Sequence, residues 1–180
     1  LPHMTPSKKT FQKAMRSFGV NNDSIIIIYD TLGIYSSPRV WWLFKYFGHE
    51  KTFILNGGLK KWLKEDKPIT KKIFKHKIGN FKIKTNRFLK INYKIILKNL
   101  NKKNFIILDA RNKKRFEGKE KEPRAGLQSG HIPKSNNLFW GNLITKRGTV
   151  KSKNQLKKIF KKYNLNNKKN IVTSCGSGIT

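Results

Sequence analysis

The sequence predicts an α/β fold in which a parallel sheet is flanked by helices, and it predicts that such a domain occurs twice. Three observations support this prediction. Short apolar runs alternate with helical patterns along the chain, as a parallel sheet covered by helices requires. A stretch of 24 residues is similar to a second stretch that begins 145 positions later. The length of 180 residues suits one ordinary domain or two small ones.

The two similar stretches are residues 7–30 and 152–175, which align without a gap. Each opens with Ser-Lys, continues as an amphipathic helix pattern, passes an Asn-Asn pair and ends in an apolar strand. Chance similarity is the alternative in a chain rich in Lys and Asn, but the shared order of helix, turn and strand argues against it. Because an offset of 145 residues is the size of a domain, we infer a duplicated α/β domain.

The first domain is expected to alternate between helices and strands. Apolar residues recur at helical spacing from Phe11 onward, and the isoleucines at the start of residues 25–30 predict a buried strand. Ser37 is a good N-cap and Pro38 suits the first helical position, which together predict a helix over residues 39–47. The elements expected next are a strand at 52–55 and a helix at 59–64.

A basic stretch without strong structural signals, residues 71–90, separates the two domains. We expect residues 1–78 to be the C-terminal part of a non-catalytic domain and residues 79–90 to be a linker. Residues 91–180 are then the N-terminal part of a second, catalytic domain. Both domains are therefore expected to be incomplete, as parts of a longer two-domain protein. The second domain is expected to open with a helix near 93–100 and a strand at 105–110.

The charge of the chain is strongly positive, with 34 Lys and 7 Arg against 9 acidic residues and a formal net charge of +32. Taken alone, this charge suggests nucleic acid or an anionic membrane as a partner. The chain also holds 20 Ile, 18 Asn and only 3 Ala, and the codons of Lys, Ile and Asn are rich in A and T. We therefore attribute the lysines to base composition and expect neither nucleic acid nor membrane as a partner. A basic binding module remains the alternative.

The second copy of the repeat ends in a glycine-rich loop, residues 175–180, with the sequence CGSGIT. A strand that leads into such a loop directs successive backbone N–H groups at one point, where they hold an anion or stabilise a thiolate. Cys175 is therefore expected to have a lowered thiol pKa and to act as a nucleophile near neutral pH. A small buried cysteine at a strand end is the structural alternative. The first copy carries Asp30 at the equivalent position, so we expect that domain to be catalytically silent.

Motifs along most of the chain resemble those of the 3-mercaptopyruvate sulfurtransferases, which are tandem-domain members of the rhodanese superfamily. The loop CGSGIT is similar to the active-site loop of that family. Motifs similar to its first domain lie at residues 29–30, 37–42, 47–50 and 55–59. Motifs similar to its second domain lie at residues 108–111, 115–118, 122–124 and 129–133. The motifs occur in the order of the family, so the resemblance implies two rhodanese-like domains.

This resemblance implies that Cys175 accepts sulfur and becomes a persulfide. The remaining loop residues would form the cradle around it: Gly176, Ser177, Gly178, Ile179 and Thr180. Arg115 and Arg124 match the two arginines with which the family binds the carboxylate and carbonyl of the substrate. A planar guanidinium suits this task because it binds a carboxylate with two parallel hydrogen bonds. The resemblance implies neither a metal nor a cofactor.

The loop chemistry favours 3-mercaptopyruvate as the sulfur donor. The resemblance implies cyanide or a thiol, such as that of reduced thioredoxin, as the acceptor. Gly176, Ser177 and Gly178 are neutral, whereas thiosulfate-preferring rhodaneses usually carry a basic residue in this loop. Three alternatives remain: a thiosulfate sulfurtransferase on the same scaffold, a cysteine phosphatase of the related cell-cycle type, and an inactive basic binding module. His131, in a Gly-His-Ile-Pro segment, is expected to serve mainly structure.

The single cysteine cannot form an internal disulfide, and the start of the chain has no signal-peptide pattern. These features favour a reducing compartment, so we expect the protein in the cytoplasm. No apolar run has the length of a membrane span. We also expect the chain as given to be poorly active, because no residues follow Thr180 to form the helix behind the cradle.

Overall fold

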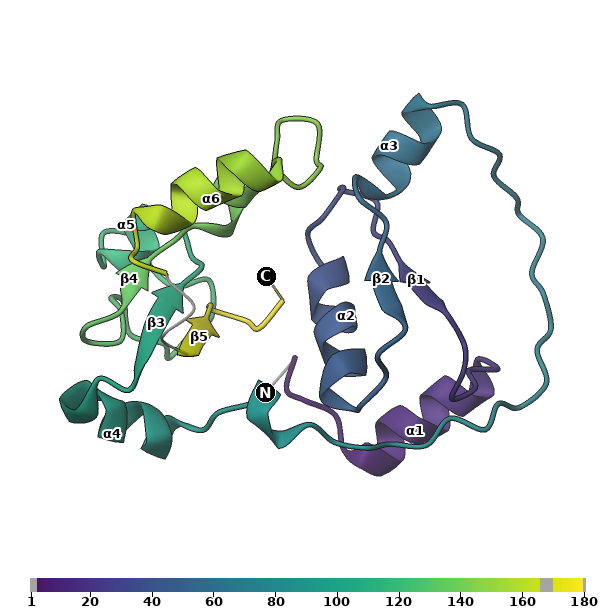
Figure 1. Ribbon diagram of the computed structural model, residues 1–180, viewed down its shortest axis with the longest axis horizontal. Helices are drawn as coiled ribbons and strands as arrows, with labels where there is room; N and C mark the ends of the chain where they lie inside the picture. The colour runs from purple at the N-terminus through teal and green to yellow at the C-terminus, as the bar shows by residue number, and fades with distance from the viewer. Residues whose placement is uncertain (1–2, 166–169, 180) are drawn as a thin grey trace. The chain divides into compact units, whose positions relative to one another are not determined.

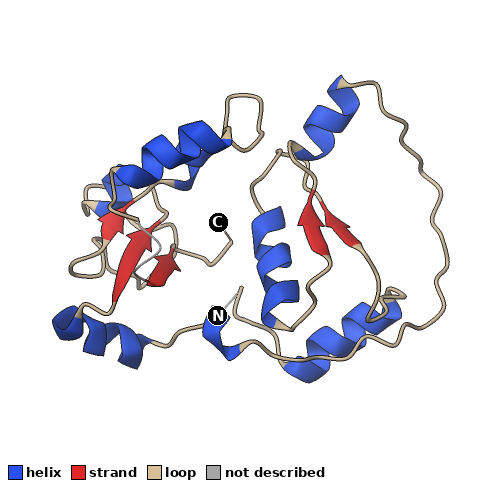
Figure 2. Ribbon diagram, in the orientation of Figure 1, coloured by secondary structure: helices blue, strands red, loops and turns tan. Residues whose placement is uncertain are grey.

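The computed structural model describes residues 3–165 and 170–179 of the chain. The chain divides into two compact units (Figure 1). Unit 1 consists mainly of the residues up to Lys90, and unit 2 mainly of the residues from Ile91 onward. Helices and strands alternate within each unit (Figure 2). The expected α/β architecture is therefore confirmed.

Unit 1 is built on a pair of parallel strands. Its elements are α1 (Lys8–Ser17), β1 (Ile26–Ile28), α2 (Ser37–Tyr46), β2 (Thr52–Ile54), α3 (Gly58–Lys64) and the short 3-10 helix η1 (Arg87–Leu89). β1 and β2 pair in parallel, with Ile26 opposite Thr52. Helix α2 packs against both strands (Figure 1).

The N-cap of α2 differs from the prediction by one residue, and the helix begins two residues before the predicted range. Ser37 is the first helical residue, and Ser36 is the N-cap but makes no side-chain capping bond. The physical reason is the carboxylate of Asp30, whose Oδ2 accepts the backbone N–H of Ser37 at 3.0 Å. The carboxylate accepts the N–H groups of the N-cap Ser36 and of the first helical residue Ser37, so a hydroxyl cap is not required.

The core of unit 1 is aromatic. Phe11 of α1 stacks on Phe47 with ring centroids 4.4 Å apart, and it meets Phe44 and Phe81 edge to face. Ile28 of β1 completes the buried cluster. Offset and edge-to-face arrangements of this kind stabilise a core beyond the area that they bury.

Part of the segment that the sequence places in the linker packs into unit 1. Phe81 is only 1% exposed and belongs to the aromatic core. Its carbonyl accepts the Nε–H of Arg16 at 2.8 Å, and its N–H donates to the carbonyl of Val20 at 3.1 Å. Farther along, the N–H of Lys84 donates to the carbonyl of Phe47 at 3.0 Å. These residues are therefore tied to α1 and to the end of α2.

Unit 2 contains a three-stranded sheet with the order β4-β3-β5, and both pairings are parallel. Its elements are α4 (Tyr93–Lys102), β3 (Phe105–Asp109), α5 (Lys113–Phe116), β4 (Asn136–Asn137), the 3-10 helix η2 (Trp140–Leu143), α6 (Lys153–Lys161) and β5 (Asn170–Ser174). Ile107, Leu108 and Leu138 are buried at its centre. The side chain of Asn99, also buried, bonds both the N–H and the carbonyl of Phe105, so α4 is clipped to the start of β3.

The two stretches that are similar in sequence adopt the same elements in the same order. Ser7 caps α1 by accepting the N–H of Thr10, and Ser152 caps α6 by accepting the N–H of Gln155. A strand follows in each case, β1 in unit 1 and β5 in unit 2. The first Asn-Asn turn lies before β1, whereas the second, at residues 166–167, lies outside the described residues.

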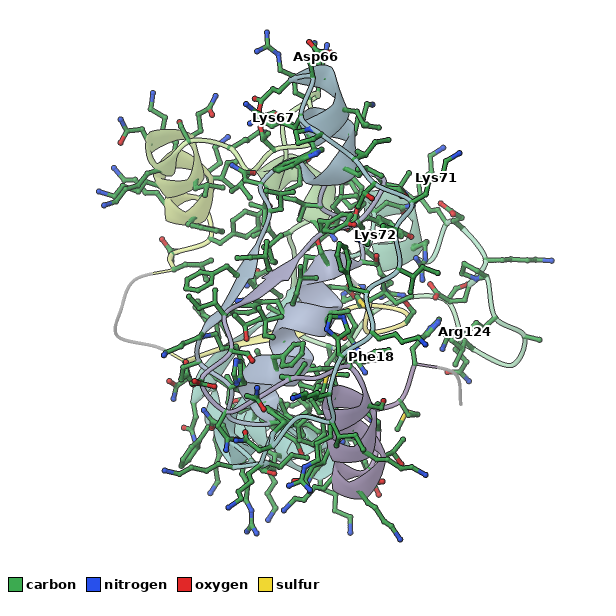
Figure 3. All side chains as sticks on the ribbon, turned by 90° about the vertical axis from the view of Figure 1, so that its right-hand side faces the viewer. Phe18, Asp66, Lys67, Lys71, Lys72 and Arg124 are labelled. Carbon is green, nitrogen blue, oxygen red and sulfur yellow. The ribbon has the colours of Figure 1, made fainter. Side chains whose placement is uncertain are left out.

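The lysines lie mainly on exposed parts of the chain. Lys67, Lys71 and Lys72 follow α3 and are all exposed (Figure 3). In the part of the chain that the structure describes, no helix combines the length and the hydrophobicity needed to cross a membrane.

Candidate active site

The pairing of β3 with β5 determines where Cys175 lies. Asp109, the last residue of β3, is opposite Ser174, the last residue of β5. The N–H of Ala110 donates to the carbonyl of Ser174 at 2.8 Å, which extends the pairing to the end of both strands. Cys175 is the next residue and is partly buried. It therefore lies at the carboxyl edge of the sheet, where α/β proteins place their ligands.

A backbone amide of the loop points at the sulfur. The N–H of Gly178 donates to Sγ of Cys175 at 2.9 Å. Gly178 has a φ of +72°, a left-handed conformation that glycine adopts without steric cost. An N–H donor held on sulfur favours the thiolate over the thiol. Ser177 and Ile179 are partly buried in the same loop, and Thr180 lies outside the described residues.

Arg115 is the predicted substrate-binding residue that the structure brings to this loop. It lies on α5, whose N-cap Asn112 accepts the N–H of Arg115 at 2.8 Å. Its guanidinium lies directly against the backbone of Gly176, because a Cβ added at that glycine would be 2.2 Å from Nη2 of Arg115. Gly176 is therefore required for the close approach of the guanidinium to the loop.

Arg115 is held by a carboxylate that sequence analysis did not assign to the site. Glu122 accepts Nε–H of Arg115 at 3.0 Å and Nη2–H at 2.5 Å, and its side chain is 3% exposed. The hydrogen bond from Arg115 lowers the pKa of the Glu122 carboxyl, burial opposes this, and a bond from Arg111 lowers it further. The bond to Glu122 raises the pKa of Arg115 against the effect of burial. The pair is therefore charged on both sides.

Arg111 extends this pair to a cluster of four charges, which we call the Arg–acid cluster: Asp109, Arg111, Arg115 and Glu122. Nε and Nη2 of Arg111 donate to the carboxylate of Asp109, and Nη1 donates to Oε1 of Glu122 at 2.8 Å. Nη2 of Arg111 also donates to the carbonyl of Gly130 at 2.6 Å. The hydrogen bond to Asp109 raises the pKa of Arg111 although burial opposes it.

Two further residues singled out in the sequence have different surroundings. Arg124 lies in the turn after Glu122, where its carbonyl accepts the N–H of Leu127 at 3.4 Å; its side chain is labelled in Figure 3. Among the described residues, Arg115 contacts the loop at Gly176. His131 stacks on Phe116 with ring centroids 3.8 Å apart, and its Nδ1 donates to the carbonyl of Phe116 at 2.7 Å. This packing agrees with a structural role for His131.

The position of unit 1 that is equivalent to Cys175 lies in a ring of amides. Oδ2 of Asp30 accepts the N–H groups of Tyr35, Ser36 and Ser37, and Oδ1 accepts that of Leu32. Burial raises the pKa of this carboxyl, but the bonds from Tyr35, Ser37 and Ser36 outweigh it and lower the pKa to about 2. The loop of unit 1 thus surrounds an anion of its own.

Residues 2–65 and 93–180 match the protein family described as the rhodanese-like domain. The chain belongs to the rhodanese family. The resemblance in the sequence motifs is therefore confirmed, and the parallel sheets with flanking helices are those of the rhodanese fold.

The proteins similar to the chain include some named thiosulfate sulfurtransferase and some named 3-mercaptopyruvate sulfurtransferase. The thiosulfate sulfurtransferase of Bos taurus is 38% identical over 180 residues, which cover 98% of this chain and 61% of the relative. The 3-mercaptopyruvate sulfurtransferase of Escherichia coli (strain K12) is also 38% identical over 180 residues, covering 100% of this chain and 64% of the relative. The chain thus spans about three fifths of the length of these curated rhodaneses.

Solved rhodanese structures include a close geometric match. The crystal structure of SseA from Escherichia coli, titled as a 3-mercaptopyruvate sulfotransferase with the rhodanese fold, superposes with a TM-score of 0.88 at 36% identity. The match covers 100% of this chain and 67% of that chain. The similarity therefore extends over both units.

Proposed function

We propose that the protein is a sulfurtransferase that moves sulfur from 3-mercaptopyruvate to a thiol acceptor through a persulfide on Cys175. The observation that carries this proposal is the hydrogen bond from the N–H of Gly178 to Sγ of Cys175, in a loop against which the guanidinium of Arg115 is packed. A stabilised thiolate beside a carboxylate-binding cation suits an anionic sulfur donor. In this proposal unit 2 is the catalytic rhodanese domain and unit 1 its non-catalytic duplicate.

Formation of the persulfide requires no oxidant or reductant other than 3-mercaptopyruvate. The Cys175 thiolate attacks the sulfur of 3-mercaptopyruvate, so that an S–S bond forms and the C–S bond breaks. The electron pair of the broken bond leaves with carbon as the enolate of pyruvate, which takes a proton from water or from the hydroxyl of Ser177. The donor's own sulfur and its hydrogen stay on Cys175 as the persulfide. An acceptor thiolate then attacks the outer sulfur and releases Cys175. Arg115 and Arg124 would bind the donor's carboxylate and carbonyl.

A thiosulfate sulfurtransferase is the second candidate. The reason is that a relative named thiosulfate sulfurtransferase and one named 3-mercaptopyruvate sulfurtransferase have similar sequence identities to the chain, 38% and 36%. Two features favour 3-mercaptopyruvate. The loop residues Gly176, Ser177 and Gly178 are neutral, and the charges of the Arg–acid cluster cancel. A net positive site favours a dianion such as thiosulfate, whereas one guanidinium edge is sufficient for a single carboxylate.

Steady-state kinetics of the full-length protein with both donors tests the proposal. We expect a higher kcat/KM for 3-mercaptopyruvate than for thiosulfate, and a mass increase of one sulfur atom on the peptide that contains Cys175 after donor alone is added. A higher kcat/KM for thiosulfate would favour the second candidate. No turnover with either donor, and no added sulfur, would refute sulfur transfer altogether.

The partners follow from the same proposal. We propose reduced thioredoxin or a similar thiol as the acceptor, the cytoplasm as the compartment, and no function in nucleic-acid binding despite the net charge of +32. A salt titration of DNA binding tests the last point, because phosphate contacts make affinity fall steeply with salt. A protein without sulfur transfer but with tight, salt-dependent DNA binding would be the basic binding module.

A further inference from the structure

The carboxylate of Glu122 accepts hydrogen bonds from two arginines. Its Oε1 accepts both Nε–H of Arg115 and Nη1–H of Arg111, and its Oε2 accepts Nη2–H of Arg115 at 2.5 Å. Only 3% of the side chain is exposed, although it belongs to a segment whose neighbours Lys121 and Pro123 are exposed. The carboxylate is therefore directed inward, onto two guanidinium groups.

The geometry leaves one edge of Arg115 available to a ligand. A guanidinium has two edges that can each bind a carboxylate with two parallel bonds. Glu122 occupies the edge formed by Nε and Nη2. Among the residues that the structure describes, the edge that includes Nη1 has no acceptor from the protein. Arg115 is thus anchored on one side and remains able to bind a second carboxylate on the other.

The anchor also fixes where that second edge lies. Nη2 of Arg115 lies against the backbone of Gly176, and Oε2 of Glu122 is 3.3 Å from the position of a Cβ at that glycine. The carboxylate and the guanidinium therefore meet directly beside the loop that carries Cys175. A shift of Glu122 would move the Arg115 guanidinium relative to the sulfur.

We propose that Glu122 is a positioning and specificity-determining residue: it holds Arg115 against the Cys175 loop by one edge and cancels its charge, so that the site selects a carboxylate donor over a dianion. This inference rests on the proposed sulfur transfer. It follows from the balance of the cluster, in which Asp109 and Glu122 offset Arg111 and Arg115. Without Glu122, the site would gain one unit of positive charge and Arg115 would lose its fixed orientation.

The variant Glu122→Gln tests this role in the full-length protein, because it keeps the size of the side chain and removes its charge. The matched control is Glu117→Gln, which removes a partly exposed carboxylate whose ion-pair partners among the described residues are Lys113 and Lys119. For Glu122→Gln we expect kcat/KM for 3-mercaptopyruvate to fall about tenfold or more, and the ratio of thiosulfate to 3-mercaptopyruvate use to rise about fivefold or more. The control should match the wild type in both quantities.

A readout independent of turnover is the pH profile of Cys175 alkylation by iodoacetamide. The charged groups of the described elements that act on Arg115 beside the loop include Glu122, Arg111 and Glu120, and Asp109 is paired with Arg111. Removing the charge of Glu122 should shift this profile to lower pH, because the thiolate then faces an uncompensated guanidinium. A residue that only supports the fold would not produce an acidic shift together with a loss of donor use.

The variant Glu122→Asp distinguishes the effect of the carboxylate charge from the effect of side-chain length. It also provides a test if Glu122→Gln does not fold. It keeps the charge but shortens the side chain, so we expect weaker use of 3-mercaptopyruvate with an unchanged donor ratio. An equal loss for both donors in Glu122→Gln with an unmoved pH profile would overturn the inference, as would an altered donor ratio in Glu122→Asp. A wild type that uses neither donor would instead refute the proposed function.

Discussion

The backbone N–H of Tyr35 donates a hydrogen bond of 2.8 Å to Oδ2 of Asp30, at the position of unit 1 that corresponds in sequence to Cys175. The N–H groups of Ser36 and Ser37 reach the same oxygen at 3.0 Å. In unit 2 the N–H of Gly178 is directed at sulfur in a comparable way. Each loop therefore directs backbone N–H at the side chain that follows the strand, one N–H group at the sulfur in unit 2 and four at the carboxylate in unit 1.

Replacing Asp30 with Asn should destabilise unit 1 and alter its response to acid. Because the pKa of Asp30 is lowered from 3.8 to about 2, its contribution to stability is present above about pH 4 and is lost as the pH falls toward 2. We expect a loss of about 1–2 kcal/mol at neutral pH, after allowance for partial exposure. Thermal unfolding at pH 7 and at pH 2.5 measures it, and the difference between variant and wild type should shrink at the lower pH. The exposed Asp23→Asn is the control; an equal effect there would show that general charge, and not the amide ring, is responsible.

Replacing Cys175 with Ser should abolish sulfur transfer and leave the fold intact. The side chain changes by one atom, and the N–H of Gly178 retains an acceptor, but an alcohol at neutral pH is not a comparable nucleophile. Cyanide-dependent thiocyanate formation and mass spectrometry of the sulfur-loaded protein are the measurements. Retained turnover in Cys175→Ser would show that sulfur is carried elsewhere.

Replacing Gly176 with Ala should displace the guanidinium of Arg115, because the new Cβ would be 2.2 Å from Nη2. We expect a fall of about tenfold or more in kcat/KM for 3-mercaptopyruvate, with little change in thermal stability, since a side-chain end yields more easily than backbone. A double-mutant cycle with Arg115→Ala gives the control. The two losses should be strongly non-additive, and additive losses would contradict the contact.

Replacing either Arg115 or Arg124 with Lys should weaken donor use by about 1–3 kcal/mol, the scale of a lost charged hydrogen bond. Lysine keeps the charge but cannot bind a carboxylate through two parallel bonds. The loss should appear in kcat/KM for 3-mercaptopyruvate. Unchanged kinetics in Arg124→Lys alone would restrict substrate binding to Arg115, and unchanged kinetics in both would remove the arginines from the site.

The elements of the fold were predictable where a local pattern decides them. The isoleucines of β1 and the serine caps of α1 and α6 are signals contained within a few residues. The packing of Phe81 was not predictable, because its neighbours in sequence are polar and its partners, Phe11 and Phe44, lie far away in the chain. Burial there depends on tertiary contacts that no local pattern reveals.

The residues of the candidate site also divide into those that the sequence predicts and those that depend on tertiary contacts. Cys175 and Arg115 follow from motifs, and the structure brings Arg115 to the loop of Cys175. Asp109 and Glu122 lie in motifs that were noted but were given no role. Their importance comes from pairing with Arg111, across 2 and 11 positions of sequence, and from burial. The sequence signal that could have pointed to them is the scarcity of acidic residues: the chain has only 9, and Asp109 and Glu122 lie in motifs that also contain an arginine.

The clip between Asn99 and Phe105 has a consequence for the order in which unit 2 folds. It joins residues only 6 positions apart, so α4 and β3 can associate early, whereas β3 and β5 join residues such as Phe105 and Asn170 that are 65 positions apart. Closing that longer loop costs more chain entropy and makes the step slow. β5, which precedes Cys175, is then expected to pair with β3 only after α4 and β3 have associated, so the loop that follows β5 takes its place late in the folding of unit 2.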